Sequence, residues 1–263
     1  MVPEERAVCH SLVCILRSTV VGLGLLLGPG TVSARECSTT LKVGLDIGHS
    51  PAAPGATSAS GKTEYTFNKR FVLELGETAR KHLMLNLINI NSEERDLTLD
   101  ERTAIAKKHS VDLFVSIHHD SVNKKYWREN IVDGVKSIYS NAFRGFSIFV
   151  SPTNIEYQKS LLAARLVARK FKEGRMMQTL HHAEPIPGEG RKIVDWDLGV
   201  YDAPFAVLKT AASPSILIEL GVIIHPDEEL VLEDPGYRAR AVEYIIAALT
   251  DYCAALQAGT KKQ

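Results

Sequence analysis

The stretch from Asp112 to Ser121, DLFVSIHHDS, constrains the fold of this chain more than any other part of the sequence. Its apolar and β-branched residues are typical of a strand buried in an α/β sheet, where helices cover both faces. Ligand sites in such sheets lie beyond the carboxyl ends of the strands, so His118 stands where a metal or substrate would bind. Taken alone, a histidine at a strand end is more often a hydrogen-bonded structural residue.

Length and charge describe a globular chain. The sequence has 263 residues, of which 45% are hydrophobic, and it carries 31 basic and 31 acidic side chains. Once the N-terminal segment is set aside, about 220 residues remain, which is the size of one domain. A neutral balance provides no basic surface for nucleic acid, so we expect no nucleic-acid partner. We expect a monomer.

Residues 1–34 have the features of an export signal. Arg17 precedes the apolar core from Ser18 to Leu27, and Val32-Ser33-Ala34 forms a small-residue cleavage site after Ala34. The core is shorter than the roughly 20 residues that span a bilayer, so we expect no stable membrane anchor. The sequence therefore predicts an exported protein of the periplasm or cell envelope, with one domain over residues 35–263.

The cysteines leave two alternatives open. Cys9 and Cys14 would be removed with the signal, which leaves Cys37 and Cys253 near the two ends of the domain. Export permits a disulfide between them, and two free buried thiols are the alternative. No Cys-x-x-Cys or Cys/His spacing indicates a cysteine zinc site.

Alternating strand and helix patterns predict parallel strands joined by helical crossovers. Apolar residues recur every fourth position at Phe67, Phe71, Leu75, Ala79 and Leu83, as expected for a helix that packs on a sheet. The predicted strands are 41–47, 83–90, 113–117, 145–150, 203–208 and 215–220, and the predicted helices start near 63, 100, 154 and 235. Residues 121–144 are predicted to be an irregular charged insertion and 174–199 to be a loop.

Four polar residues stand at the ends or beginnings of these elements: His49, Glu64, His118 and Glu219. Two imidazoles and a carboxylate are a ligand set of catalytic zinc, which keeps one position open for water. A further carboxylate, Glu219, could take the proton of that water. For Glu64 alone, a favourable interaction with the helix dipole is an alternative explanation.

At these residues the chain resembles the zinc-dependent N-acetylmuramoyl-L-alanine amidases of the amidase 3 type. The resemblance covers about residues 41–252 and includes LDIGHS, Thr63-Glu64, ERTAIAKKHSVDLFVSIHHDS and the strand ILIELG with the two helices that follow it. It implies Zn²⁺ held by His49, Glu64 and His118, with Glu219 as the catalytic base. It also implies an α/β fold of the phosphorylase/hydrolase-like kind, a single domain with a twisted, mostly parallel sheet of about six strands and helices on both faces.

The activity implied by the resemblance is hydrolysis of the peptidoglycan amide between N-acetylmuramic acid and L-alanine. Two alternatives stay open: a zinc hydrolase of another amide, such as a carboxypeptidase or deacetylase, and a wall-binding module without catalysis. The substrate implied is peptidoglycan, and the need for a protein activator is left open.

The chain departs from the family pattern at several positions. Ile47 and Ser50 replace the usual proline and glycine beside His49, and His119 is an additional histidine. Because successive strand residues point to opposite faces, we expect His119 to be structural. The loop 174–199 is expected to flank the zinc. Four of its polar residues could approach the metal but are expected to be solvated: His181, His182, Glu184 and Glu189.

Overall fold

The structure is a computed structural model, and it describes residues 39–132 and 135–260. The predicted export signal and Cys37 lie outside these residues. Within them, a seven-stranded sheet has the order β2-β1-β3-β9-β6-β8-β7, and β4 and β5 form a separate two-stranded sheet. The strands are β1 Leu41–Ile47, β2 Leu85–Asn89, β3 Leu113–Asp120, β4 Arg128–Val132, β5 Val135–Tyr139, β6 Ser147–Val150, β7 Lys192–Asp195, β8 Val200–Asp202 and β9 Ser215–Val222.

The sheet is mostly parallel, as predicted, and has seven strands instead of about six. Strands β2, β1, β3 and β9 run in the same direction, while β6 pairs antiparallel with β9 and parallel with β8. The carboxyl ends of β1, β3 and β9 therefore meet at one edge, together with the first residue of β6. This edge carries His118 on β3 next to Glu219 on β9, which are register partners.

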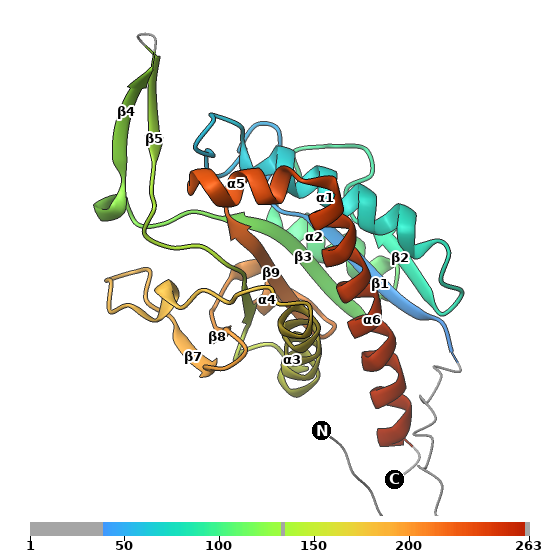
Figure 1. The fold of residues 1–263 in the computed structure, drawn as a ribbon. Coiled ribbons are helices and arrows are strands. Elements are labelled where there is room, and N and C mark those ends of the chain that lie inside the picture. The colour runs from blue at the N-terminus through green and yellow to red at the C-terminus, as the bar shows by residue number, and fades with distance from the viewer. Residues whose placement is uncertain (1–38, 133–134, 261–263) are drawn as a thin grey trace, which may run out of the picture. The chain divides into compact units, whose positions relative to one another are not determined.

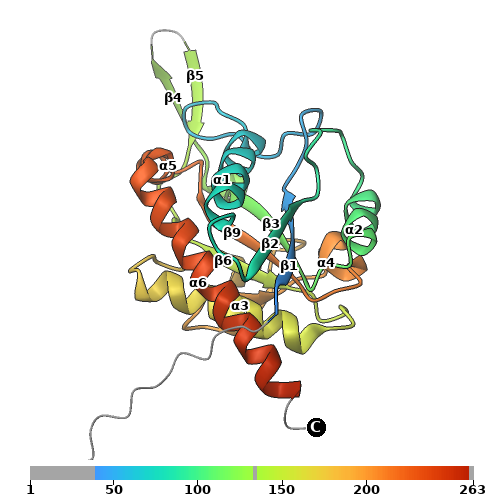
Figure 2. The ribbon, with the colours of Figure 1, turned by 90° about the vertical axis from the view of Figure 1, so that its right-hand side faces the viewer.

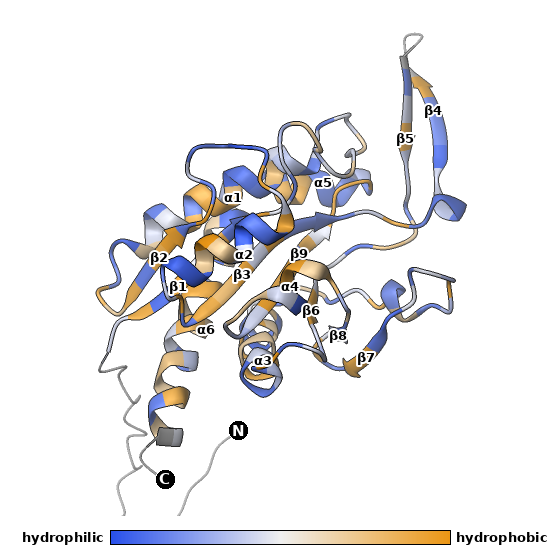
Figure 3. Cartoon of the chain, turned by 180° about the vertical axis from the view of Figure 1, so that it is seen from behind, coloured by the Kyte–Doolittle hydropathy of each residue, from blue (hydrophilic) through white to orange (hydrophobic). Residues whose placement is uncertain are grey.

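Helices cover both faces of the sheet (Figures 1 and 2). One face packs against α1, α3 and α6 and forms the larger apolar core, and the other packs against α2 and α4. Figure 3 shows β3 orange along most of its length and blue at its carboxyl end, so the strand passes from the core into a polar site. The helices are α1 Glu64–Ala79, α2 Leu99–Lys108, α3 Tyr157–Glu173, α4 Ala206–Thr210, α5 Pro226–Glu233 and α6 Pro235–Thr260.

Local sequence signals explain where the first two helices begin and end. The stripe of α1 is buried from Phe67 to Ala79, but Leu83 is 88% exposed because the helix ends before it. Helix α2 begins at a capping box, in which Thr98 accepts from the Glu101 amide and the Glu101 side chain accepts from the Thr98 amide. Such caps satisfy amides that a helix N-terminus otherwise leaves unpaired.

Three segments differ from the prediction. The insertion 121–144 contains the β4–β5 hairpin, which projects away from the main sheet (Figure 1). The segment 174–199 contains a short 3-10 helix, His181–Ala183, and the edge strand β7. The predicted strand 203–208 is wrong, because β8 ends at Asp202 and α4 begins at Ala206. A short apolar run does not distinguish strand from helix by periodicity.

The start of β1 and the end of α6 are neighbours. Gln257 Nε2 donates to Thr39 Oγ1 over 2.8 Å, and Cys253 is disulfide-bonded. This position is compatible with Cys37 as its partner, but Cys37 is outside the described residues, so that pairing stays a prediction. Within 39–132 and 135–260, no helix is both long and apolar enough to cross a membrane.

Candidate metal and catalytic site

The predicted ligand residues His49, Glu64 and His118 lie together at the carboxyl edge of the sheet. His49 Nε2 lies 2.9 Å from Glu64 Oε2, and His118 Nδ1 lies 2.9 Å from Glu64 Oε1. The two imidazole rings meet edge to face with their centroids 5.0 Å apart. One ligand atom from each residue lies within 4.8 Å of the others, so the three could hold one metal ion.

The backbone around His49 is shaped to present its ring. His49 has a φ of 69°, a left-handed conformation that is uncommon for residues other than glycine. Gly55 also has a positive φ, and a Cβ at that position would lie 2.5 Å from Glu64 Oε2. Glycine is therefore required where the loop 51–61 crosses the ligand residues. The left-handed backbone of His49 is the kind of strain found at functional sites, and it costs roughly 1–3 kcal/mol.

The Glu64 carboxylate is held by groups that surround it. It accepts from the Ala56 amide at 3.0 Å and from the His119 amide and Asn68 Nδ2, each at 3.3 Å. Burial would raise the pKa of Glu64, but the hydrogen bonds and charges of His118 and His49 outweigh it and hold this pKa below its usual range. Glu64 is thus an ionised carboxylate, as a metal ligand must be.

Arg102 and Asp46 support the strand end that precedes His49, and neither residue was predicted from the sequence. Arg102 Nη1 donates to Asp46 Oδ1 at 2.9 Å and to the Ile47 carbonyl, and Nη2 donates to the His49 carbonyl. Asp46 also accepts from the Ser116 hydroxyl on β3 at 2.7 Å. Both charged side chains are at least 96% buried. A buried arginine that faces the turn fixes the position of the His49 backbone.

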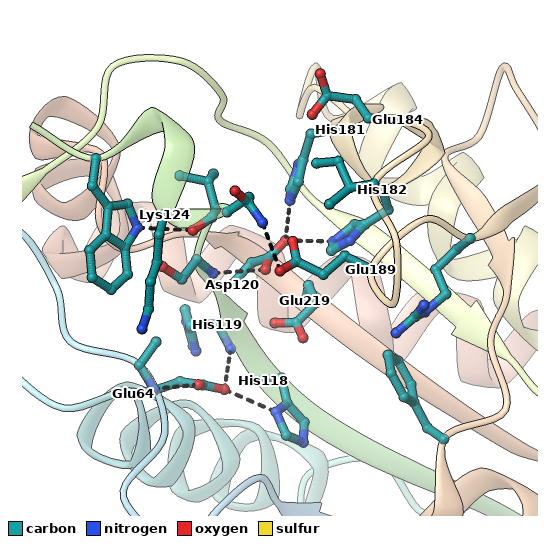
Figure 4. Close-up of a pocket in the computed structure, with 18 of the residues that line it drawn as sticks. Glu64, His118, His119, Asp120, Lys124, His181, His182, Glu184, Glu189 and Glu219 are labelled. Atoms are coloured by element: carbon teal, nitrogen blue, oxygen red, sulfur yellow. Dashed lines mark hydrogen bonds and ion pairs between the residues drawn. The ribbon is translucent and has the colours of Figure 1, made fainter.

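Glu219 lies beside the ligand residues and is not part of them. In Figure 4 its side chain lies between His118 and Asp120. Glu219 Oε2 is buried with no hydrogen-bond partner among the described residues. Burial and then the charges of Asp120 and Glu64 raise the pKa of Glu219 well above its usual range. Because the charges of Asp120 and Glu64 cause part of this rise, neutralising these two carboxylates would lower the pKa of Glu219 and favour its ionised form.

His119 points away from the ligand set. Its Nδ1 lies 2.7 Å from Asn68 Oδ1 and its ring packs against Phe67. Burial lowers the pKa of His119 to about 3, so its ring is neutral. The alternation of side chains along β3 explains the different environments of His118 and His119.

A second group of ligand-type residues consists of Asp120, His181 and His182. His182 Nε2 lies 2.7 Å from Asp120 Oδ2, and His181 Nε2 lies 3.3 Å from the same oxygen. The expectation that the two histidines are solvated is wrong, since His181 is buried and His182 is largely covered. They reach the sheet because Thr179 N donates to Phe146 O immediately before β6.

The acidic residues of the 174–199 segment bind elsewhere. Glu184 accepts from the Tyr126 hydroxyl, and Glu189 accepts from Asn123 Nδ2 at 2.8 Å. Neither carboxylate is in the His49–Glu64–His118 group. Both groups of ligand-type residues, Glu219, Glu184 and Glu189 line one cavity of about 410 Å³. Its walls also include Ala56, Val122, Lys124, Trp127, Ile186, Arg191 and Phe205.

Comparison with known proteins agrees with this architecture. The sequence pattern of the Amidase_3 family, described as N-acetylmuramoyl-L-alanine amidase, matches residues 43–251. The N-acetylmuramoyl-L-alanine amidase AmiA of Escherichia coli (strain K12) is 25% identical over 254 residues, which cover 86% of this chain and 80% of AmiA. The chain belongs to the Amidase_3 family, and it is an enzyme of the peptidoglycan amidase class.

Solved structures share the fold. The catalytic domain of CwlV, an N-acetylmuramoyl-L-alanine amidase from Bacillus (Paenibacillus) polymyxa var. colistinus, matches with a TM-score of 0.60 and 21% identity, over 81% of this chain and 98% of that domain. The CwlD amidase of Clostridioides difficile, solved in complex with the GerS lipoprotein, matches with a TM-score of 0.61 and 18% identity, over 82% of this chain and 100% of CwlD.

Proposed function

We propose that the protein hydrolyses the amide between N-acetylmuramic acid and L-alanine of peptidoglycan, with zinc held by His49, Glu64 and His118. The observation that carries the proposal is the convergence of two imidazoles and one ionised carboxylate at the carboxyl edge of the sheet. Family membership supports the substrate, and the neighbouring carboxylate of Glu219 supports the reaction type.

The residues present fit a zinc ion. Two neutral imidazoles and a carboxylate form one of the ligand sets of catalytic zinc. Hydrogen bonds from Ala56, Asn68 and the His119 amide orient the Glu64 carboxylate, which is the support that metal ligands require. When bound, zinc supplies Lewis acidity that polarises a carbonyl and lowers the pKa of water.

The chain's own groups perform the proton transfers in this proposal. Glu219 takes a proton from the attacking water and gives it to the leaving amide nitrogen. The new carbon–oxygen bond forms at the lactyl carbonyl as the carbon–nitrogen bond breaks, so the products are a lactyl carboxylate and a peptide with a free L-alanine amino group. Within the described residues, Glu219 Oε2 has no hydrogen-bond partner that would compete for the proton.

We propose export to the cell envelope as the setting of this reaction, because the substrate lies outside the cytoplasm. Support comes from the sequence of residues 1–34, which has the order of a signal peptide. Glu184 and Glu189 of the 174–199 segment bind Tyr126 and Asn123 instead of the ligand residues. We therefore propose that the purified chain acts on peptidoglycan without an activator.

The test is mass spectrometry of purified peptidoglycan after digestion, with and without a chelator. We expect stem peptides with a free L-alanine amino terminus, and no such products with the chelator. Release of D-alanine or acetate would instead identify a carboxypeptidase or deacetylase. Zinc content without any product would identify a wall-binding module.

Variants of the ligand residues complete this test. Ala substitution of His49, Glu64 or His118 removes one of three protein ligands, so zinc content at this site and activity should fall together. His109→Ala is the matched control, since His109 is exposed at the end of α2. Normal hydrolysis by His118→Ala would reject the assignment.

A further inference from the structure

We propose that Asp120, His181 and His182 form a second binding site for a divalent transition-metal ion of the zinc class. The site lies in the same cavity as the first ligand set but shares no residue with it. The inference rests on the positions of these three side chains and does not depend on the reaction proposed above.

The ligand atoms converge as a metal would require. The Nε2 atoms of both histidines lie close to one oxygen, Asp120 Oδ2, at 2.7 Å for His182 and 3.3 Å for His181. Zinc bonds of about 2.0–2.1 Å at tetrahedral angles place ligand atoms about 3.3 Å apart. His181 Nε2 is already at this distance from Asp120 Oδ2, and His182 Nε2 would have to move away from that oxygen by about 0.6 Å to match it. Figure 4 shows both rings directed at Asp120 from the 174–199 segment.

The other polar side-chain atoms of Asp120 and His181 already have partners that fix the orientation of these two residues. Asp120 Oδ1 accepts from the Ser121 amide at 2.7 Å, which leaves Oδ2 directed at the histidines. His181 Nδ1 lies 2.8 Å from Thr179 Oγ1. Metal-binding histidines usually make such a hydrogen bond with the ring nitrogen that does not bind the metal.

A buried ring nitrogen without a hydrogen bond points independently to a ligand. The His181 side chain is 8% exposed, and its Nε2 is buried without a hydrogen-bond partner among the described residues. The 3.3 Å approach to Asp120 lacks the alignment of a hydrogen bond. Buried polar atoms nearly always have a partner, and an absent ion is one explanation for an exception.

The donor set indicates the class of ion. Two imidazole nitrogens suit zinc, copper, nickel or cobalt, whereas magnesium and calcium prefer oxygen ligands. An ion at this position would tie the 179–184 segment to the end of β3. It would also place a second positive charge on the cavity wall near Glu219, whose carboxylate interacts with that of Asp120.

The test counts bound zinc in the full-length chain by elemental analysis after equilibration with zinc and removal of excess. We expect two zinc ions per chain in the wild type and in His109→Gln, and one in His182→Gln. The double variant H49Q/H118Q lacks the first set, and it should still bind one ion. Adding His182→Gln to that double variant should remove the last ion.

Thermal unfolding supplies a readout that is independent of activity. In the H49Q/H118Q background, zinc should raise Tm, and the rise should disappear when His182→Gln is added. One ion in the wild type, unchanged by His182→Gln and lost in H49Q/H118Q, would overturn the second site. One ion in the wild type that is lost with His182→Gln and kept in H49Q/H118Q would support the second site and contradict the proposed zinc ligands.

Discussion

Glu219 is the residue whose chemistry is most sensitive to a small change. Substitution by Gln keeps its size but removes the carboxylate that would accept a proton. We expect E219Q to keep its zinc and lose about 10²- to 10⁴-fold in kcat, which is typical of removed general bases. Initial rates on purified peptidoglycan, with zinc content measured in parallel, check this. Unchanged turnover would assign the base elsewhere, and loss of zinc would make Glu219 a ligand.

Arg102 is expected to contribute to stability and not directly to chemistry. R102M removes the partner of buried Asp46, and breaking a buried ion pair costs about 3–5 kcal/mol. Urea unfolding of R102M and of the wild type measures this loss of stability. R169M replaces an exposed arginine of α3 and should lose less than about 0.5 kcal/mol. The double variant D46N/R102M removes the unpaired charge, so it should be more stable than R102M; equal stability would contradict this account.

The convergence of His49, Glu64, His118 and Glu219 at one edge of the sheet could be predicted, because each stands near the carboxyl end of a strand or at the start of a helix. Their roles as metal ligands and base stay predictions. The second group could not be assembled in the same way. Asp120 and His182 are 62 residues apart, and their contact depends on the pairing of Phe146 with Gln178. Nothing in the local pattern of residues 174–199 indicates that pairing, so solvation was the expected state of both histidines.

Among the elements, long periodic segments were predictable and short ones were not. The burial of Phe67, Phe71 and Leu75 follows from a four-residue spacing maintained over several turns. Residues 203–208 offer only a short apolar run, and tertiary packing decides whether the run forms a strand or a helix. Val207 and Leu208 are buried in a helix of five residues. Asn154 Nδ2 stabilises this arrangement by donating a hydrogen bond to the Leu208 carbonyl.

The 174–199 segment is expected to modulate access without blocking it. Glu184 and Glu189 bind Tyr126 and Asn123, so neither carboxylate competes for the first ligand set. Deletion of residues 183–191 should therefore change kcat/KM by less than about tenfold, or about 1.4 kcal/mol. Kinetics on peptidoglycan, with zinc at the first set verified, check this.

The substitution pair E184Q/E189Q is a milder companion to this deletion, because it keeps the backbone. It should also stay within about tenfold of the wild type. A rise of a hundredfold or more in the deletion variant would show an autoinhibitory segment and imply an activator.

For the whole molecule, Glu228 links stability to pH. Its carboxylate accepts from the amides of Gly145 and Val222, and burial raises the pKa of Glu228 to about 7. The folded state holds this proton more tightly than the unfolded state. The resulting stabilisation is complete below about pH 4.5 and is lost as pH rises to about 7, by roughly 3 kcal/mol in total.

E228Q cannot titrate, so it isolates this effect. Urea unfolding in EDTA should show the wild type losing roughly 3 kcal/mol relative to E228Q between about pH 4.5 and 7, with no further relative change above about pH 8. EDTA removes the pH dependence of metal binding from both proteins. A difference between the two proteins that stays constant with pH would show that Glu228 has an ordinary pKa.

The position of β9 in the sheet determines the order in which the residues of the site are synthesised and brought together. This strand is the last in sequence, yet it lies between β3 and β6, and His118 pairs with Glu219 across all of residues 119–218. Pairing of such distant segments is slow, and chains are synthesised from the N-terminus. His49, Glu64 and His118 are therefore all made before Glu219, so a growing chain contains the three proposed zinc ligands long before the proposed base. We expect an unfinished chain to be harmless to the wall that the completed chain cuts.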